Sequence, residues 1–97
     1  MLSVEEVKTR LRPVFESNGT RKAILFGSIA KGTQSFGSDV DILVDSGLHG
    51  LRFFGLLEDV CNALGVPVDL IDERQLKRES GMRREIDRTG VIIYERP

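Results

Sequence analysis

Two aspartates, Asp39 and Asp41, stand one residue apart at the start of an apolar run, Val40 to Val44. Side chains alternate between faces along a strand, so both carboxylates should point the same way, with Cβ atoms roughly 7 Å apart. Charges of one sign this close repel each other, and each carboxylate loses hydration beside a core. A divalent cation between them would make the arrangement favourable, because Mg²⁺ prefers carboxylate, water and phosphate oxygens. Alone, the pair favours a simpler interpretation, in which Asp39 starts the strand after a Gly-Ser turn and Asp41 faces solvent.

Asp69 adds a third carboxylate in a similar setting. It interrupts the sequence VPVDLI at residues 66–71, which is otherwise apolar, so its charge is costly unless it is paired or metal-bound. If its strand neighbours the strand of Asp39 and Asp41, all three carboxylates can share one face of a sheet. Such a group suits metal-assisted phosphoryl or nucleotidyl transfer, in which two ions roughly 4 Å apart bind a triphosphate and activate a hydroxyl.

A glycine and a serine follow the preceding apolar run, Ala23 to Phe26. Gly27 permits a tight turn and lets a phosphate approach with no Cβ in the way. Ser28 would begin the next helix, where unpaired N–H groups and its hydroxyl can hold an anion, and Lys31 follows one turn later. A Gly-Ser pair after a strand is also a common helix cap, so its significance depends on the aspartates that follow.

Helix and strand patterns alternate along the whole chain. Apolar side chains recur at helical spacing from Val4 to Phe15 and from Phe53 to Leu64, and a polar helix is expected within 73–89. Residues 3–6 form a capping-box sequence, and Pro13 is expected to kink or restart the first helix. Strands are expected at 23–26, 40–44, 66–71 and, as a strand or extended tail, 91–95. This order predicts one α/β (α+β) domain over residues 1–97, with a small mixed sheet of three to four strands flanked by helices.

The composition narrows the classes of protein. The chain has 97 residues, 40% of them hydrophobic, which is typical of one soluble domain, and no apolar run approaches the roughly 20 residues of a membrane span. The N-terminus lacks a signal-peptide core, and the single cysteine, Cys61, cannot form an internal disulfide, so a cytoplasmic location is expected. A net charge of −1 gives no reason to expect general affinity for nucleic acid.

Four other residues receive structural interpretations. His49 lies in a glycine-flanked loop and is expected to be solvated. A helix cannot bury Phe53 and Phe54 equally, so one should join the core while the other can form an exposed patch that meets a partner. Tyr94 is the only tyrosine; packing of the C-terminal segment is favoured over self-modification.

The complete pattern of a strand, Gly-Ser, Asp-x-Asp in a second strand and a later single Asp resembles the minimal nucleotidyltransferase family, which shares the DNA polymerase β-type nucleotidyltransferase fold. The matching residues are Gly27-Ser28, Gly32, 38–44 and 68–70. This resemblance implies Mg²⁺ as the cofactor and a nucleoside triphosphate, usually ATP, as the substrate. It implies that the metal and catalytic residues are Asp39, Asp41 and Asp69. It also implies that the nucleotide-binding residues are Gly27, Ser28, Lys31 and Ser38.

Minimal members of this family are similar to the antitoxin halves of two-gene toxin–antitoxin pairs, whose partner is an all-helical HEPN ribonuclease. The resemblance therefore implies a co-encoded HEPN-type partner and transfer of AMP to a protein hydroxyl. A second interpretation stays open, in which the chain is a non-catalytic antitoxin or nucleotide-binding module that neutralises its partner by direct binding. A small sheet can leave an unpaired edge, which either a homodimer or a hetero-oligomer would cover.

Overall fold

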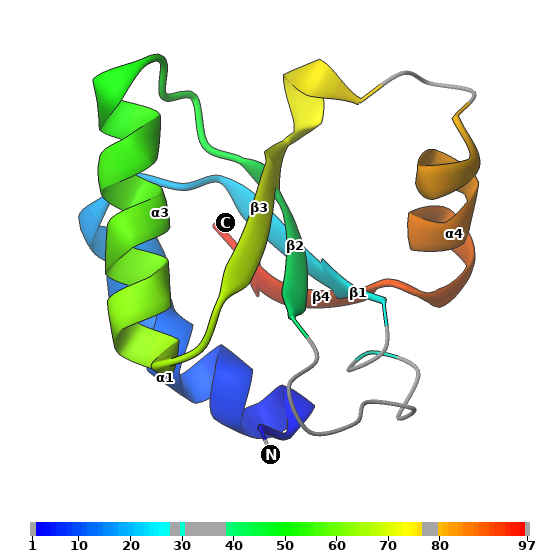
Figure 1. Cartoon of the computed structure of the whole chain (residues 1–97), viewed down its shortest axis with the longest axis horizontal. Coiled ribbons are helices and arrows are strands. Elements are labelled where there is room, and N and C mark those ends of the chain that lie inside the picture. The colour runs from blue at the N-terminus through cyan, green and yellow to red at the C-terminus, as the bar shows by residue number, and fades with distance from the viewer. Residues whose placement is uncertain (1, 28–29, 31–38, 77–79, 97) are drawn as a thin grey trace.

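A computed structural model describes residues 2–27, 30, 39–76 and 80–96 of the chain. The described elements are α1 (Val4–Ser17), β1 (Lys22–Phe26), β2 (Val40–Asp45), α3 (Leu51–Leu64), β3 (Val68–Asp72), the short 3₁₀ helix η1 (Glu73–Gln75), α4 (Gly81–Thr89) and β4 (Val91–Glu95) (Figure 1). The strands form one sheet in the order β3-β2-β1-β4. The β2–β3 pair is parallel and the other two pairs are antiparallel, which confirms the predicted mixed sheet.

The capping box at the start of α1 is present. The backbone N–H of Glu6 donates to Ser3 Oγ at 3.1 Å, and the backbone N–H of Ser3 donates to Glu6 Oε1 at 3.4 Å. Of the two outcomes expected at Pro13, a kink or a restart, the restart does not occur, because α1 continues through Pro13 to Ser17. Proline costs one backbone hydrogen bond, whereas ending the helix there would remove part of its apolar face from the core. The buried residues of that face are Val7, Leu11 and Phe15.

The two faces of the sheet are covered differently (Figure 1). On one face, α1 and α3 pack over the main core, to which β2 contributes Val40, Ile42 and Val44. On the other face, Ile86 of α4 forms a smaller cluster with Phe26 and Leu43. Because side chains alternate along β2, Asp41 lies on the same face as Leu43, the face against which Ile86 of α4 packs.

Asp72 anchors the end of β3 through a buried polar network. Its side chain is 4% exposed and accepts hydrogen bonds from Ser46 Oγ at 2.9 Å, from Arg74 Nε at 3.0 Å and from the Arg74 backbone N–H at 2.9 Å. Burial raises the pKa of Asp72, but the hydrogen bonds from Arg74 and Ser46 outweigh burial and leave that pKa below its ordinary value. Asp72 is thus the N-cap of η1 and a structural residue.

Asp72→Ala is expected to lower the free energy of unfolding by about 2–3 kcal/mol, because Ser46 and Arg74 lose a buried partner. The folded-state pKa of Asp72 lies below its unfolded value, so its contribution is complete above that unfolded value and is lost as the pH falls through the folded pKa. Urea unfolding from about pH 6 to about pH 2 measures both effects. Asp72→Asn should reduce the fall in the free energy of unfolding at acid pH, whereas Glu58→Gln, at an exposed position, should leave that fall unchanged. An equally large fall in Asp72→Asn would contradict the structural role of Asp72.

Candidate functional site

The sheet brings the predicted carboxylates to one place. Asp41 and Asp69 are direct register partners across the parallel β2–β3 pair, so their side chains leave the same face on neighbouring strands. Asp39 immediately precedes β2, two residues before Asp41, and is exposed. Asp69 is also exposed, on the edge strand β3, whereas Asp41 is half-buried. The expectation that the two aspartate-bearing strands are neighbours is confirmed.

Gly27 lies directly against the Asp41 side chain. Phe26 is the register partner of Asp41 on β1, and the chain turns at the next residue with a φ of +79° at Gly27. A Cβ atom added at Gly27 would collide with Asp41 Oδ2 and would lie 3.3 Å from Asp41 Cγ. Both the left-handed backbone and the lack of space therefore require glycine at this position.

Negative charge accumulates around Asp41. Burial raises the pKa of Asp41, and the charges of Asp69, Asp39 and Glu85 raise it further. Glu85 of α4 is not among the site residues that the sequence predicts. No local signal in its polar helix identifies it, because its position depends on Ile86 packing against Phe26 and Leu43. Four acidic residues thus influence one end of this sheet face.

The donor set fits a hard divalent cation. Carboxylate oxygens are ligands that such ions prefer, and the mutual repulsion that raises the pKa of Asp41 is the cost that a cation would remove. Within the described ranges, no group of three or more acidic, histidine or cysteine side chains is already gathered closely enough to hold a metal ion.

Only part of the predicted nucleotide site is placed. Gly27 is described, whereas Ser28, Lys31 and Ser38 lie outside the described residues.

The other residues singled out in the sequence lie as predicted. His49 is exposed and contacts the Arg74 guanidinium. Phe54 is exposed, whereas Phe53 packs against the core. Tyr94 packs against Phe15 with ring centroids 5.4 Å apart, which agrees with the packing interpretation.

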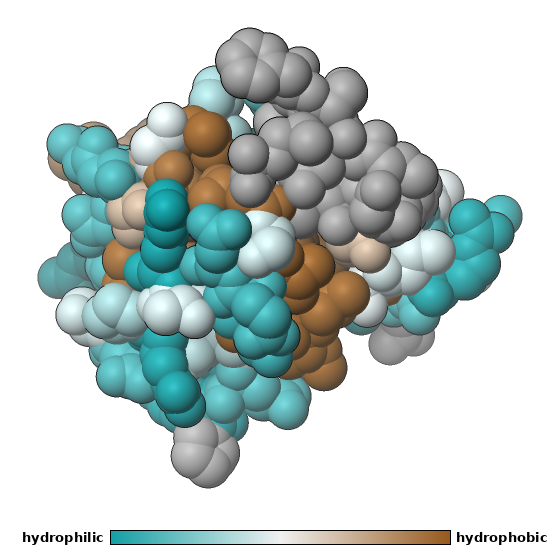
Figure 2. Space-filling model, turned by 90° about the horizontal axis from the view of Figure 1, so that it is seen from below, coloured by the Kyte–Doolittle hydropathy of each residue, from teal (hydrophilic) through white to brown (hydrophobic). Residues whose placement is uncertain are grey.

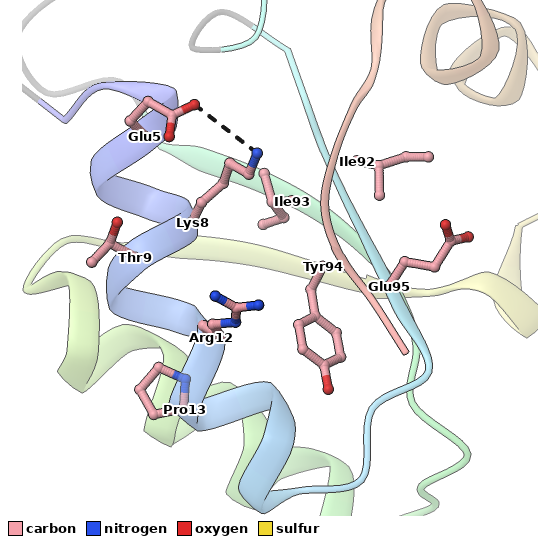
Figure 3. Close-up of a pocket in the computed structure, with 9 residues that line it drawn as sticks. All are labelled: Glu5, Lys8, Thr9, Arg12, Pro13, Ile92, Ile93, Tyr94 and Glu95. Atoms are coloured by element: carbon pink, nitrogen blue, oxygen red, sulfur yellow. Dashed lines mark ion pairs between the residues drawn. The ribbon is translucent and has the colours of Figure 1, made fainter. Parts of the chain in front are cut away.

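A pocket of about 530 Å³ lies between α1 and β4 (Figure 3). Lys8 and Arg12 of α1 face Ile93 and Tyr94 of β4 across it. Seen from below, hydrophilic side chains lie beside an apolar area (Figure 2). Ile92 of β4, which lines the pocket, is 46% exposed. This pocket belongs to the α1 side of the sheet, opposite the carboxylates, so it is not part of their site.

None of the described helices has the length and hydropathy needed to cross a membrane.

Comparison with known proteins agrees with this geometry. Residues 9–97 match the family described as Polymerase beta, Nucleotidyltransferase. The chain is 36% identical to the protein adenylyltransferase MntA of Thermococcus cleftensis over 96% of this chain and 98% of that protein. A crystal structure of a toxin–antitoxin with AMP-PNP contains a chain with 25% identity and a TM-score of 0.76, covering 92% of this chain and 73% of that one.

A further solved structure shows the same fold. It contains the tri-AMPylated Shewanella oneidensis HEPN toxin in complex with an MNT antitoxin, with 20% identity and a TM-score of 0.71 over 96% of this chain and 73% of that chain. The family generally uses a divalent metal ion together with a nucleotide. Its match covers most of the sequence, including Gly27 and all three aspartates of the site. This chain therefore belongs to the Polymerase beta nucleotidyltransferase family.

Proposed function

We propose that the protein is a Mg²⁺-dependent adenylyltransferase that moves AMP from ATP to a hydroxyl of a protein partner, and that it is the antitoxin of a HEPN/MNT pair. The observation that carries this proposal is the register pairing of Asp41 with Asp69 on the sheet face beside Gly27. The relative named protein adenylyltransferase MntA and the toxin–antitoxin structure with AMP-PNP support the same nucleotide and the same class of partner.

Each residue of the site has a role in this proposal. Asp39, Asp41 and Asp69 would hold Mg²⁺, which when bound neutralises triphosphate charge. Gly27 leaves room for the Asp41 carboxylate, whose Oδ2 lies where a Cβ would be, and Ser28, Lys31 and Ser38 would complete the nucleotide site. Asp69 would also accept the proton of the attacking hydroxyl, because it is exposed on an edge strand that a partner can reach.

The reaction balances with ATP and the acceptor alone. The acceptor oxygen forms a bond to the α-phosphorus while the bond from that phosphorus to the bridging oxygen breaks. Pyrophosphate leaves, and the hydroxyl proton passes to Asp69. The protein contributes position and charge, which are the main sources of catalysis in phosphoryl transfer.

The test combines the purified protein, Mg²⁺, ATP and its co-encoded HEPN-type partner. Intact mass spectrometry should show the gain of one or more AMP groups on the partner, and the gain should disappear with Asp39→Asn/Asp41→Asn. A complex that forms with no gain on either chain would reject the transferase and favour the non-catalytic antitoxin. Replacing Mg²⁺ with EDTA should also abolish the gain.

A further inference from the structure

The strand that carries Asp69 lies at an edge of the sheet. β3 comes first in the strand order β3-β2-β1-β4, so β2 is its one neighbour among the described strands. The backbone N–H of Val40 donates to the Pro67 carbonyl at 3.2 Å, which determines the groups of β3 that face β2. Backbone groups of successive strand residues point to opposite sides. Those of Asp69 therefore face β2, whereas those of Val68 and Leu70 face outward.

The outward backbone groups of β3 are available for pairing. Among the described residues, no backbone hydrogen bond outside the sheet uses the N–H or the carbonyl of Val68 or Leu70. Figure 1 shows α3 on one side of β3 and α4 on the other, with no described segment in front of β3. An unpaired row of such groups is a template on which an extended segment of another chain can add as a strand.

The helix α3 has two flanks that differ in what they face. Val60 is fully buried at the centre of the side that packs on the core. At about 100° per residue, Asp59 and Cys61 lie on opposite flanks of α3, and Leu57 lies between Val60 and Cys61. Asp59 accepts a hydrogen bond from the Asn18 side chain at 3.2 Å, so its flank faces α1.

The other flank of α3 lies beside the free edge of β3. Because α1 contacts β4 and α3 contacts β3, the two helices lie side by side across the sheet, with α3 on the β3 side. The flank that carries Leu57 and Cys61 therefore faces away from α1, toward the outer edge of β3. Both side chains are half-buried. A strand added to β3 would thus meet an apolar surface on its α3 side.

The position of Asp69 indicates what such a strand would carry. The Asp69 side chain leaves the sheet face that carries Asp41, whereas Val68 and Leu70 face the α3 layer. On an added strand, the Cβ of the residue opposite Asp69 would lie about 5 Å from the Asp69 Cβ. A hydroxyl at that residue would lie beside the carboxylate proposed to take its proton. The residues before and after it would point toward the apolar flank of α3.

We propose that the outer edge of β3 binds an extended segment of the acceptor protein as an added strand. This segment carries the accepting hydroxyl opposite Asp69 and apolar residues at the two flanking positions. The role of the hydroxyl rests on the proposed function. A second copy of this chain paired at the same edge would instead cover Asp69 and close the site to an acceptor.

Amide hydrogen exchange, followed by NMR, tests this pairing in the unmodified protein. In the free protein, the N–H groups of Val68 and Leu70 should exchange faster than those of Asp69 and Ile71, which face β2. The complex is then formed with the co-encoded HEPN-type partner, Mg²⁺ and α,β-methylene-ATP, whose α–β bridge transfer cannot break. Exchange at Leu70 should slow at least about 10-fold in this complex, while exchange in β4 stays unchanged. Unchanged exchange at Leu70 would overturn the proposal.

A proline variant tests the same hydrogen bonds through affinity. Val68→Pro removes an outward N–H at the first residue of β3, a position where an edge strand tolerates proline. Val68→Ala is the matched control, because it shortens the side chain and keeps the N–H. After circular dichroism has shown both variants to be folded, calorimetry should give a partner Kd at least about fivefold higher for Val68→Pro than for Val68→Ala. Equal Kd values would contradict the added strand, and exchange at Leu70 decides the matter if Val68→Pro does not fold.

AMP transfer from ATP to the partner is measured separately. Slower exchange at Leu70 without transfer supports the added strand and rejects the transferase. Transfer without slower exchange rejects the added strand alone. Slow exchange at Leu70 in the free protein that depends on protein concentration would assign the edge to a second copy and would also overturn the proposal.

Discussion

Asp41→Asn is expected to reduce AMP transfer at least about 1,000-fold, because it removes a carboxylate proposed to hold the metal ion, a loss of about 4 kcal/mol or more in the transition state. The same substitution should raise the Tm in EDTA. Asparagine keeps the size of the side chain but removes its repulsion by Asp69, Asp39 and Glu85. Loss of activity with gain of stability distinguishes a functional carboxylate from a structural one.

The sign of the stability effect follows from linkage. Burial and the neighbouring carboxylates raise the pKa of Asp41 in the folded protein above its unfolded value. The folded state then holds the proton more tightly than the unfolded state. Above the folded pKa, ionised Asp41 therefore lowers the free energy of unfolding. This cost falls as the pH drops through the folded pKa and disappears below the unfolded pKa. Thermal unfolding in EDTA near neutral pH, with Glu58→Gln as an exposed control, measures the effect. Retained transfer or a lower Tm in Asp41→Asn would contradict the assignment.

Gly27→Ala should reduce transfer about 100-fold and lower the free energy of unfolding by about 2–3 kcal/mol. Two causes contribute to this result. The backbone at Gly27 is left-handed, which costs an alanine roughly 1–2 kcal/mol. In addition, the new Cβ would displace the Asp41 carboxylate from its position beside the turn.

Gly19→Ala is the matched control for this experiment. Gly19 has a similar φ of +68°, but an added Cβ would meet no atom within 4 Å. It should therefore show the backbone cost in urea unfolding while transfer stays within about twofold of the unmodified protein. Equal effects of the two substitutions on transfer would show that the position of the Asp41 carboxylate against Gly27 is not required.

The local elements were predictable because their causes lie within a few residues. The capping box at Ser3 and Glu6 and the helix end at Gly65 (φ +71°) depend on neighbouring backbone groups. Alternation along β2 placed Asp39 and Asp41 on one side, since that spacing is a property of any strand. A restart at Pro13 could not be excluded from the sequence because local propensity omits the core contacts on either side of the proline.

The sequence by itself determined the candidate site residues, namely Gly27 and the aspartates Asp39, Asp41 and Asp69, and the order of the elements that hold them. Only the tertiary structure decided that Asp41 pairs with Asp69, that its carboxylate lies against Gly27, and that α4 brings Glu85 to the same sheet face. The physical reason is separation along the chain. Strand register and helix packing are set by burial of apolar surface between distant segments, and no local pattern of residues records which of those segments meet.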